Sequence, residues 1–494
     1  MLLSDFLTTL NDGHSYVGIP GLTESPESHR KTEEPLYLPI EIATIPDGLI
    51  ISKVPEKHKE WIGSRIIAVN GIDIKLLTQQ SKELAAVENL YGAYALLSSN
   101  LRDVSFLNRL LSLVPLNSTN LKDSAKSTNS AKSTKDKVTF QLLTPDNKEV
   151  SLSLQPSPRQ ETEKIKLSER PAWKELETPS DYMHYKFMDS QKQTMLFRLG
   201  SIMSRENLIY MRDCGRPSFK GELKSFYQYL LHKEMPQNEE EALTGVPAIA
   251  EIFRDMLLEM KKTGASNLVI DLRGNGGGWT PIVYPTLYML YGDEYLAKDM
   301  NAHLYHLISP LYLANRNISL EEYNNQAKVD IDPFHQHQPT EYRMGEYTFT
   351  EPAPQSVEQT REYFVKAAMG NIASCINDLN GKPLYQPNRV FVVTNERTYS
   401  AAFHYTFYLW KMGATLVGVP SSLSTNTYME GTPYQLPLTG ISGGLSNSLQ
   451  VFLPTEDPRA NILYPELMPS YADYRKYNFD KHTEILYLLD TLSK

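Results

Sequence analysis

An apolar segment that runs directly into a glycine-rich turn constrains the fold of this chain most. Residues 267–272 read Asn-Leu-Val-Ile-Asp-Leu, which is typical of a strand buried on both faces. Four glycines follow within five positions, at Gly274 and at 276–278. Such a turn leaves backbone N–H groups free to point at an anion, as in an oxyanion hole. A phosphate-binding loop is excluded, because no Lys-Ser/Thr pair follows and the G-x-G-x-x-G spacing is absent.

Further apolar segments alternate with helical stretches on both sides of this turn. Residues 246–262 have helical periodicity and end beside a glycine, the usual stop signal of a helix. Residues 389–395 and 415–419 are apolar strands, and a helix is expected between them at 400–412. This alternation predicts βαβ units, a largely parallel sheet and the α/β (α+β) fold class.

The N-terminal third has a different pattern. From about residue 36 to 76, short apolar runs alternate with turns, and Asn70-Gly71 is a strong hairpin signal. The segment Gly-Ser-Arg-Ile-Ile-Ala-Val-Asn-Gly-Ile-Asp-Ile resembles part of a PDZ domain, a module that captures extended peptides at a sheet edge. A structural β-module without a peptide groove is the alternative. Helices are expected over 82–114, and a hairpin over 138–143 and 149–154.

Residues 117–137 divide the chain. This stretch is rich in Ser, Lys and Thr and repeats Ser-Ala-Lys-Ser-Thr, so it cannot bury a core and should be a linker or loop. We expect four parts: an N-terminal piece of the catalytic region (1–35), the PDZ-like module with its helices (36–115), the linker (116–137) and the catalytic core (138–494).

Composition excludes several classes of protein. The chain has 494 residues, a formal net charge of −9 and no long basic block, which argues against nucleic acid as a partner. Its two cysteines, Cys214 and Cys375, exclude a disulfide scaffold and multi-cysteine metal sites, and they are expected to be buried thiols. No apolar stretch approaches the ~20 residues of a membrane helix. The first residues lack the basic region of a signal peptide.

Two further segments carry residues suited to nucleophilic catalysis. Asp12-Gly13-His14-Ser15 presents an imidazole, the natural general base near neutral pH, beside a turn. Ser400 lies between an expected strand and helix, where the helix dipole favours a developing oxyanion. Each has a structural alternative, since His14 can be an ordinary turn histidine and Ser400 can simply cap the helix.

Together, the three segments resemble the S41-type serine peptidases, the family of C-terminal-processing peptidases and tricorn-core proteases. The motifs that match are D-G-H-S, then D-L-R-G-N-G-G-G after a strand, and T-Y-S-A-A-F before a helix. A catalytic motif so close to Met1 leads us to expect that the natural N-terminus lies upstream, which would permit an extracytoplasmic location. The resemblance implies a ClpP/crotonase-like core with a PDZ-like module and no cofactor or metal.

The resemblance also implies roles for individual residues. Ser400 matches the nucleophile and His14 the general base, with backbone N–H groups of Gly276, Gly277 and Ala401 as the oxyanion hole. The Ser-Lys branch of the family is disfavoured, because the loop 418–426 holds no lysine. The Ser-His branch, of tricorn and chlamydial-protease-like type, also needs an orienting carboxylate.

Glu456 is the interpretation favoured for that carboxylate, with Asp457 and Glu466 nearby in the sequence. His404, one helical turn after Ser400, is an alternative base. The function expected is hydrolysis of polypeptide substrates by a serine endopeptidase or processing peptidase, as a monomer or a homo-oligomer. An inactive peptide- or lipid-binding protein on the same scaffold is the alternative, and a zymogen cut within 117–137 is a third.

Overall fold

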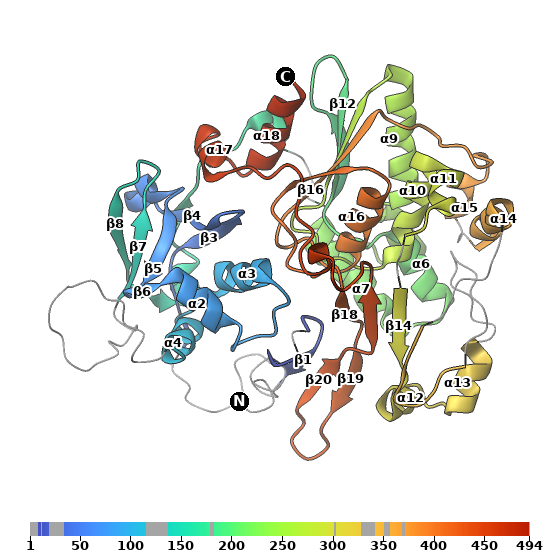
Figure 1. Ribbon diagram of the computed structural model, residues 1–494, viewed down its shortest axis with the longest axis horizontal. Helices are drawn as coiled ribbons and strands as arrows, with labels where there is room; N and C mark the ends of the chain where they lie inside the picture. The colour runs from blue at the N-terminus through green and yellow to red at the C-terminus, as the bar shows by residue number, and fades with distance from the viewer. Residues whose placement is uncertain are drawn as a thin grey trace.

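The computed structural model describes residues 8–10, 12–18, 34–114, 137–177, 182–300, 303–327, 341–349, 356–367 and 371–493. Its central sheet has five strands, in an order that runs along the chain (Figure 1). These are β11 (Met183–Phe187), β12 (Thr194–Leu199), β13 (Asn267–Asp271), β16 (Arg389–Thr394) and β17 (Thr415–Gly418). All neighbouring pairs are parallel except β11 with β12, so the predicted parallel sheet is confirmed.

Successive side chains of the central sheet enter two different cores, as the period of two in a strand requires. Met195 and Phe197 of β12 belong to the larger core, which α9 (Ile249–Thr263), α10 (Tyr284–Tyr291) and α16 (Ala401–Lys411) share. Leu196, between them, packs in a second core with Ile485 of α18 (Thr483–Leu492). Helices therefore cover both faces of the sheet, which explains its continuous apolar strands.

A separate module carries its own sheet and core, drawn in blue and cyan in Figure 1. The strands are β3 (Glu41–Ile45), β4 (Gly48–Pro55), β5 (Arg65–Val69), β6 (Ile72–Asp73), β7 (Val138–Leu143), β8 (Glu149–Leu154) and β10 (Leu167–Ser168). Its helices are α2 (Ile74–Ser81), α3 (Leu90–Asn100) and α4 (Val104–Ser112). The turn at Asn70-Gly71 is confirmed, with φ of 48° and 83°.

The module differs from the sequence-based expectation in three respects. The expected helical stretch 82–114 is interrupted, because Asn89 caps α3 and 82–89 form no helix. The hairpin β7–β8 is confirmed but pairs with β5, so the module extends past the boundary predicted at residue 138. Cys214 is exposed rather than buried, whereas Cys375 is buried, and both are free. The expected linker lies outside the described residues, apart from Lys137.

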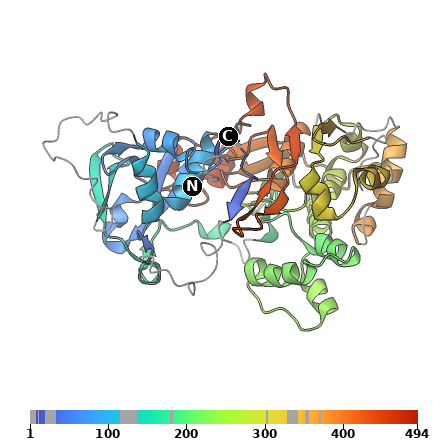
Figure 2. The same ribbon diagram turned by 90° about the horizontal axis from the view of Figure 1, so that it is seen from below.

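Two small sheets lie in the C-terminal part, and one of them includes the N-terminal segment. β1 (Tyr16–Gly18) pairs with β20 (Ser442–Leu445), which pairs with β19 (Thr432–Gln435). A second sheet contains β15 (Tyr347–Phe349), β14 (His303–Leu307), β21 (Ser448–Val451) and β18 (Thr427–Met429). Figure 2 shows the blue β1 beside the red strands, between the module and the central sheet.

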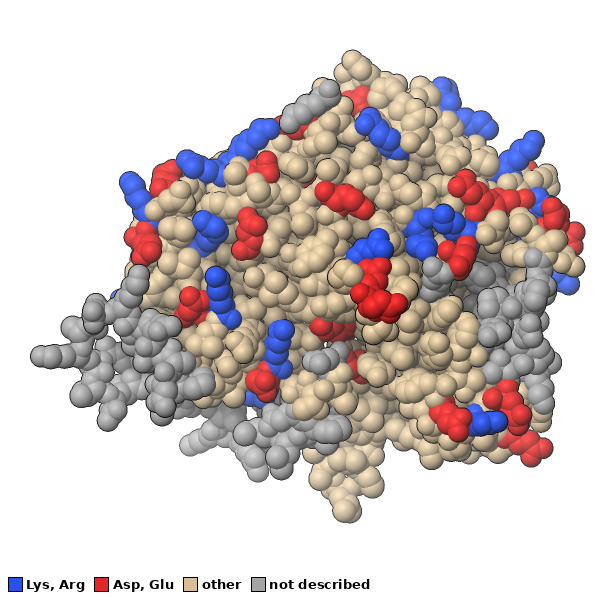
Figure 3. All heavy atoms as spheres, viewed as in Figure 1, with Lys and Arg blue, Asp and Glu red and all other residues tan. Residues whose placement is uncertain are grey.

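The surface seen in Figure 3 mixes Lys and Arg with Asp and Glu, and the basic side chains form no continuous patch on that face. No helix in the described ranges is both long and apolar enough to cross a membrane.

Candidate active site

Ser400 occupies a strained turn between β16 and α16. Its φ is 51° and its ψ −127°, a conformation that non-glycine residues rarely adopt. Such strain persists only where the surroundings impose it, and it is typical of nucleophiles on strand–turn–helix elbows. The half-buried Ser400 side chain makes no capping hydrogen bond to the helix, so simple capping does not explain it.

The glycine-rich turn packs directly against Ser400. A Cβ atom built on Gly277 would lie 2.8 Å from Ser400 Cβ and 2.9 Å from the Ala401 nitrogen. At Gly278 it would lie 2.0 Å from the carbonyl oxygen of Ile202. Both glycines also have positive φ, 105° and 144°. Glycine is therefore required at both positions by close backbone approach as well as by conformation.

The three predicted oxyanion donors differ in their availability. The Gly277 N–H donates to Asn275 Oδ1 at 2.9 Å, and Asn275 Nδ2 in turn donates to the Leu199 carbonyl. The Gly276 and Ala401 amides make no hydrogen bond within the described part of the chain. Those two amides remain free to bind an oxyanion, whereas the Gly277 amide already holds the turn in shape.

The Asp-Leu-Arg part of the motif anchors this turn to the C-terminal helix. Arg273 donates to both oxygens of Asp271 at 2.9 Å and to Glu484 of α18 at 2.6 Å. Burial alone would raise the pKa of Asp271, but the charges of Arg273 and Arg198 hold it well below its usual range. These ion pairs keep Asp271 ionised at neutral pH and hold the glycine turn in place at the end of β13.

His14 is held on a loop that docks on the C-terminal hairpin. The Asp12 carboxylate accepts the His14 N–H and the Ser446 hydroxyl, both at 3.0 Å, as well as the Ser15 hydroxyl. The His14 ring then lies with its centroid 5.1 Å from that of Tyr399, the residue before Ser400. Two motifs separated by almost 400 positions in the sequence thus meet beside the strained serine.

The surroundings of His14 keep its imidazole neutral. Burial lowers its pKa below 6.5, although Asp12, the Tyr428 backbone and Glu430 act in the opposite direction. Neither ring nitrogen makes a hydrogen bond of ordinary geometry with any described residue. A neutral imidazole with a free nitrogen can accept a proton, the task of a general base.

The predicted carboxylate is not part of this cluster of contacts. Glu456 is exposed in the turn before η5 (Pro458–Ala460), and its side chain makes no hydrogen bond or ion pair with any described residue. The carboxylates whose charges act on His14 are Asp12 and Glu430. Glu466, the other glutamate noted near Glu456 in the sequence, instead accepts hydrogen bonds from Trp410 and the Leu416 amide.

His404, the alternative base, is a core residue. Its Nδ1 lies 2.8 Å from Thr280 Oγ1, and its ring contacts Phe452 at 5.5 Å between centroids. Burial lowers the pKa of His404 to about 4. Its Nε2 makes no hydrogen bond of ordinary geometry with any described residue, and the charge of His14 also lowers the pKa of His404.

Glu88 was missed by the sequence analysis. It lies just before α3, and its carboxylate accepts hydrogen bonds from residues beside both His14 and Ser400: the Gly13 amide at 3.3 Å and the Tyr399 hydroxyl at 2.9 Å. A cavity of about 310 Å³ adjoins this contact, lined by Gly13, Glu88, Leu96 and Tyr399 among others. No local signal marks Glu88, because its partners come from distant segments.

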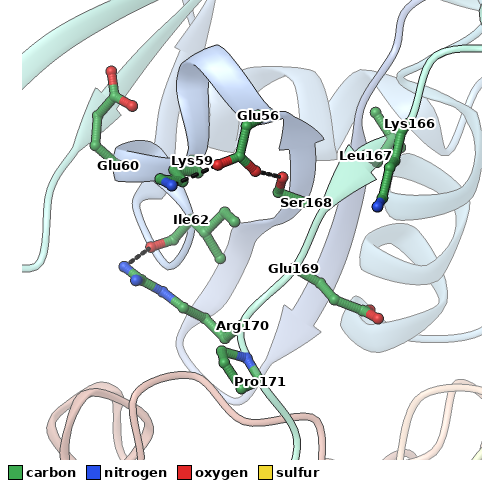
Figure 4. A pocket seen from close by; sticks show the side chains of 10 residues that line it. All are labelled: Glu56, Lys59, Glu60, Ile62, Lys166, Leu167, Ser168, Glu169, Arg170 and Pro171. Carbon is green, nitrogen blue, oxygen red and sulfur yellow. Dashed lines mark hydrogen bonds and ion pairs between the residues drawn. The ribbon is translucent and has the colours of Figure 1, made fainter.

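A second hollow, of about 720 Å³, lies on the module away from this cluster (Figure 4). Its wall consists mainly of charged side chains from η1 (Glu56–Trp61) and from the residues that flank β10, including Lys59, Glu60 and Arg170. None of its lining residues is a predicted site residue. Among the described residues, no group of three or more His, Cys, Asp or Glu could hold a metal ion.

Comparison with known proteins identifies the family. Residues 234–435, which include both the glycine turn and Ser400, match the model of peptidase family S41. This region belongs to peptidase family S41. The chain is accordingly a serine peptidase, a hydrolase, as its motifs predict.

Solved structures agree at the level of the fold. The crystal structure of mature CPAF matches with a TM-score of 0.52 and 14% identity, covering 98% of this chain and 86% of the other. Mature CPAF complexed with lactacystin gives a TM-score of 0.50 and 16% identity, with coverage of 99% and 87%. No curated protein matches the sequence.

Proposed function

We propose that this S41 peptidase is an endopeptidase or processing peptidase that cleaves polypeptides by a Ser-His acyl-enzyme mechanism. The observation that carries the proposal is the strained Ser400, with the glycine turn packed against it and the His14 ring in contact with the neighbouring Tyr399 ring. The family match supports hydrolysis over the alternative of an inactive peptide- or lipid-binding protein.

In the proposed reaction, His14 takes the proton of Ser400 as its oxygen attacks the scissile carbonyl. The bond to the leaving amine then breaks, His14 returns the proton to that amine, and an acyl-enzyme remains. Water attacks the acyl-enzyme with His14 again as base. The amides of Ala401 and Gly276 are the oxyanion donors that the hydrogen-bonding pattern supports, and each is expected to lower the activation barrier by about 3 kcal/mol.

The orienting carboxylate is the least constrained part of this mechanism. Glu456 stays a prediction, made from the sequence alone. The electrostatic surroundings of His14 support Asp12 or Glu430 instead. Asp12 already accepts three hydrogen bonds that build the His14 loop, whereas Glu430 accepts one from Ser448 at 2.7 Å. We therefore favour Glu430 as the group that stabilises the imidazolium.

A fluorophosphonate probe tests the Ser-His assignment, because it labels only an activated serine. Wild type should be labelled, and Ser400→Ala and His14→Ala should not. Ser112→Ala and His58→Ala serve as controls, since both residues lie in the module, away from the site, and should leave labelling intact. Labelling that persists in Ser400→Ala would overturn the nucleophile, and labelling that persists in His14→Ala would overturn the base.

A further inference from the structure

Glu88 connects the N-terminal module to the segments that carry both predicted catalytic residues. One carboxylate oxygen accepts the Gly13 amide and the Tyr399 hydroxyl. The other accepts the Ser424 amide at 2.9 Å and the Thr427 hydroxyl at 2.6 Å. Four chain segments therefore meet at one side chain: the His14 loop, the Ser400 turn, the segment after β17 and the approach to α3.

The contacts around Glu88 indicate positioning rather than substrate binding. A carboxylate has about four lone-pair positions for hydrogen bonds, and four donors already occupy those of Glu88. The neighbouring Asn89 strengthens the connection, since its Nδ2 donates to the Ser421 carbonyl at 3.2 Å while its Oδ1 caps α3. The approach to α3 is thus fixed to the catalytic part of the chain at two consecutive residues.

We propose that Glu88, in its ionised form, is a positioning residue that holds the His14 loop against the Ser400 turn. This inference rests on the proposed Ser-His function. Gly13 and Tyr399 each neighbour a catalytic residue in the sequence, so a displacement at Glu88 moves the base relative to the nucleophile. Misplacement of reacting groups by about 1 Å can cost roughly a hundredfold in rate.

Protonation of Glu88 would weaken this clamp. Hydrogen bonds to an ionised acceptor are about twice as strong as neutral ones, and the two backbone amides can only donate. Burial raises the pKa of Glu88 to about 7, despite the opposing hydrogen bonds from Thr427, Ser424, Tyr399 and Gly13. The clamp is therefore expected to tighten as the pH rises through neutrality.

Few other ionisable groups surround Glu88. Tyr399 bonds it directly, the His14 ring contacts the Tyr399 ring, and the charge of Asp12 also acts on Tyr399. Arg397 reaches Ser99 on the rim of the adjoining cavity, at 3.2 Å. The other described residues of the cavity wall, from the approach to α3, α3 itself and the loop after β17, carry no ionisable side chain; they include Ala85, Val87, Ala95, Asn100 and Ser422.

The test is the pH dependence of Ser400 labelling by the fluorophosphonate probe in intact protein. In wild type, the rate should rise through an apparent pKa near 7. Glu88→Gln, which imitates the protonated carboxyl, should label about tenfold more slowly at high pH. The increase in labelling rate that remains in this variant should occur below pH 6.5, where His14 titrates. Glu83→Gln, a nearby exposed change, should behave as wild type.

An unchanged rate and profile in Glu88→Gln would overturn the proposal. Should Glu88→Gln fail to fold, as judged by circular dichroism, Tyr399→Phe decides. This variant removes one donor and should slow labelling, and a wild-type rate would overturn the clamp. Failure of the proposed function is distinguishable, because Ser400→Ala would then be labelled as well as wild type.

Discussion

Asp271 and Glu88 are two desolvated carboxylates that hold segments in contact with Ser400, yet their partners differ in charge. Asp271 is paired with Arg273 and Arg198, which keep it ionised. Glu88 is surrounded by neutral donors, and its pKa is raised to about 7. The carboxylate that holds the glycine turn, Asp271, therefore stays ionised across the physiological pH range. The carboxylate that holds the His14 loop, Glu88, gains or loses its proton within that range.

The largest effect, a loss of stability, is expected when the ion pairs of Arg273 with Asp271 and Glu484 are broken. Arg273→Met leaves Asp271 and Glu484 as buried charges without their shared cation, which should cost about 3–5 kcal/mol of the free energy of unfolding. Urea denaturation measures this loss. Arg212→Met is the matched control, because its ion pairs are exposed and should contribute less than about 1 kcal/mol. Equal losses in the two variants would remove the distinction between anchor and surface pair.

The buried carboxyl of Glu88 should make the free energy of unfolding depend on pH. Because the pKa of Glu88 is higher in the folded protein than its ordinary 4.5, folding favours the protonated carboxyl, and this stabilisation is fully present below pH 4.5 and is lost as the pH rises through about 7. The ionised carboxylate holds its four donors more tightly, but burying its charge costs more than those hydrogen bonds return. The stability of Glu88→Gln relative to wild type should therefore increase between pH 5 and 8, by up to about 3 kcal/mol.

Two internal references sharpen that measurement. Asp271 contributes nothing to the change, because it is ionised throughout this range. Burial also raises the pKa of Glu396 to about 7, but that residue is present in both proteins and cancels in the difference. A difference between the two proteins that stays constant from pH 5 to 8 would contradict the raised pKa of Glu88.

Replacing one glycine by alanine in the glycine turn and one in the His14 loop compares how much each segment can move. Gly277→Ala forces a Cβ onto Ser400 and the Ala401 amide at a φ of 105°, so labelling should fall by roughly a hundredfold or more. Gly13→Ala meets only the ends of the Tyr399 and Glu88 side chains, which can move, and should cost about tenfold. Labelling rates measured at pH 8 give both values, and the reverse order would show that the His14 loop is the stiffer side.

The contrast also explains what the sequence could and could not reveal. The Ser400 turn and the glycine turn were predictable, because each is a short sequence pattern next to an apolar strand: the glycines follow β13, and Ser400 precedes α16. The parallel sheet followed from the same alternation. Glu88 was not predictable, since its donors lie between 75 and 339 positions away. Only the folded chain shows which distant donors converge on a carboxylate.

Glu456 is the opposite case: the sequence predicts it as a site residue, but the folded chain leaves it without a contact to the described site residues. Its place in the sequence near Asp457 and Glu466 predicts the orienting carboxylate, but sequence position does not determine which way a surface turn faces. In the structure this turn exposes Glu456 to solvent, while the neighbouring Asp457 is engaged by Arg459. By contrast, Glu430 comes from the end of β18, beside a backbone segment that contacts His14.

The smallest effect is expected in the comparison of substitutions at Glu430 and Glu456. A carboxylate that stabilises the imidazolium raises the pKa of the histidine and speeds acylation. Glu430→Gln should therefore lower the apparent pKa of His14 further and slow Ser400 labelling by about tenfold. Glu456→Gln, at an exposed position, should change neither quantity. NMR titration of His14 and labelling rates measure the two, and a larger effect of Glu456→Gln would restore the sequence-based assignment of the orienting carboxylate.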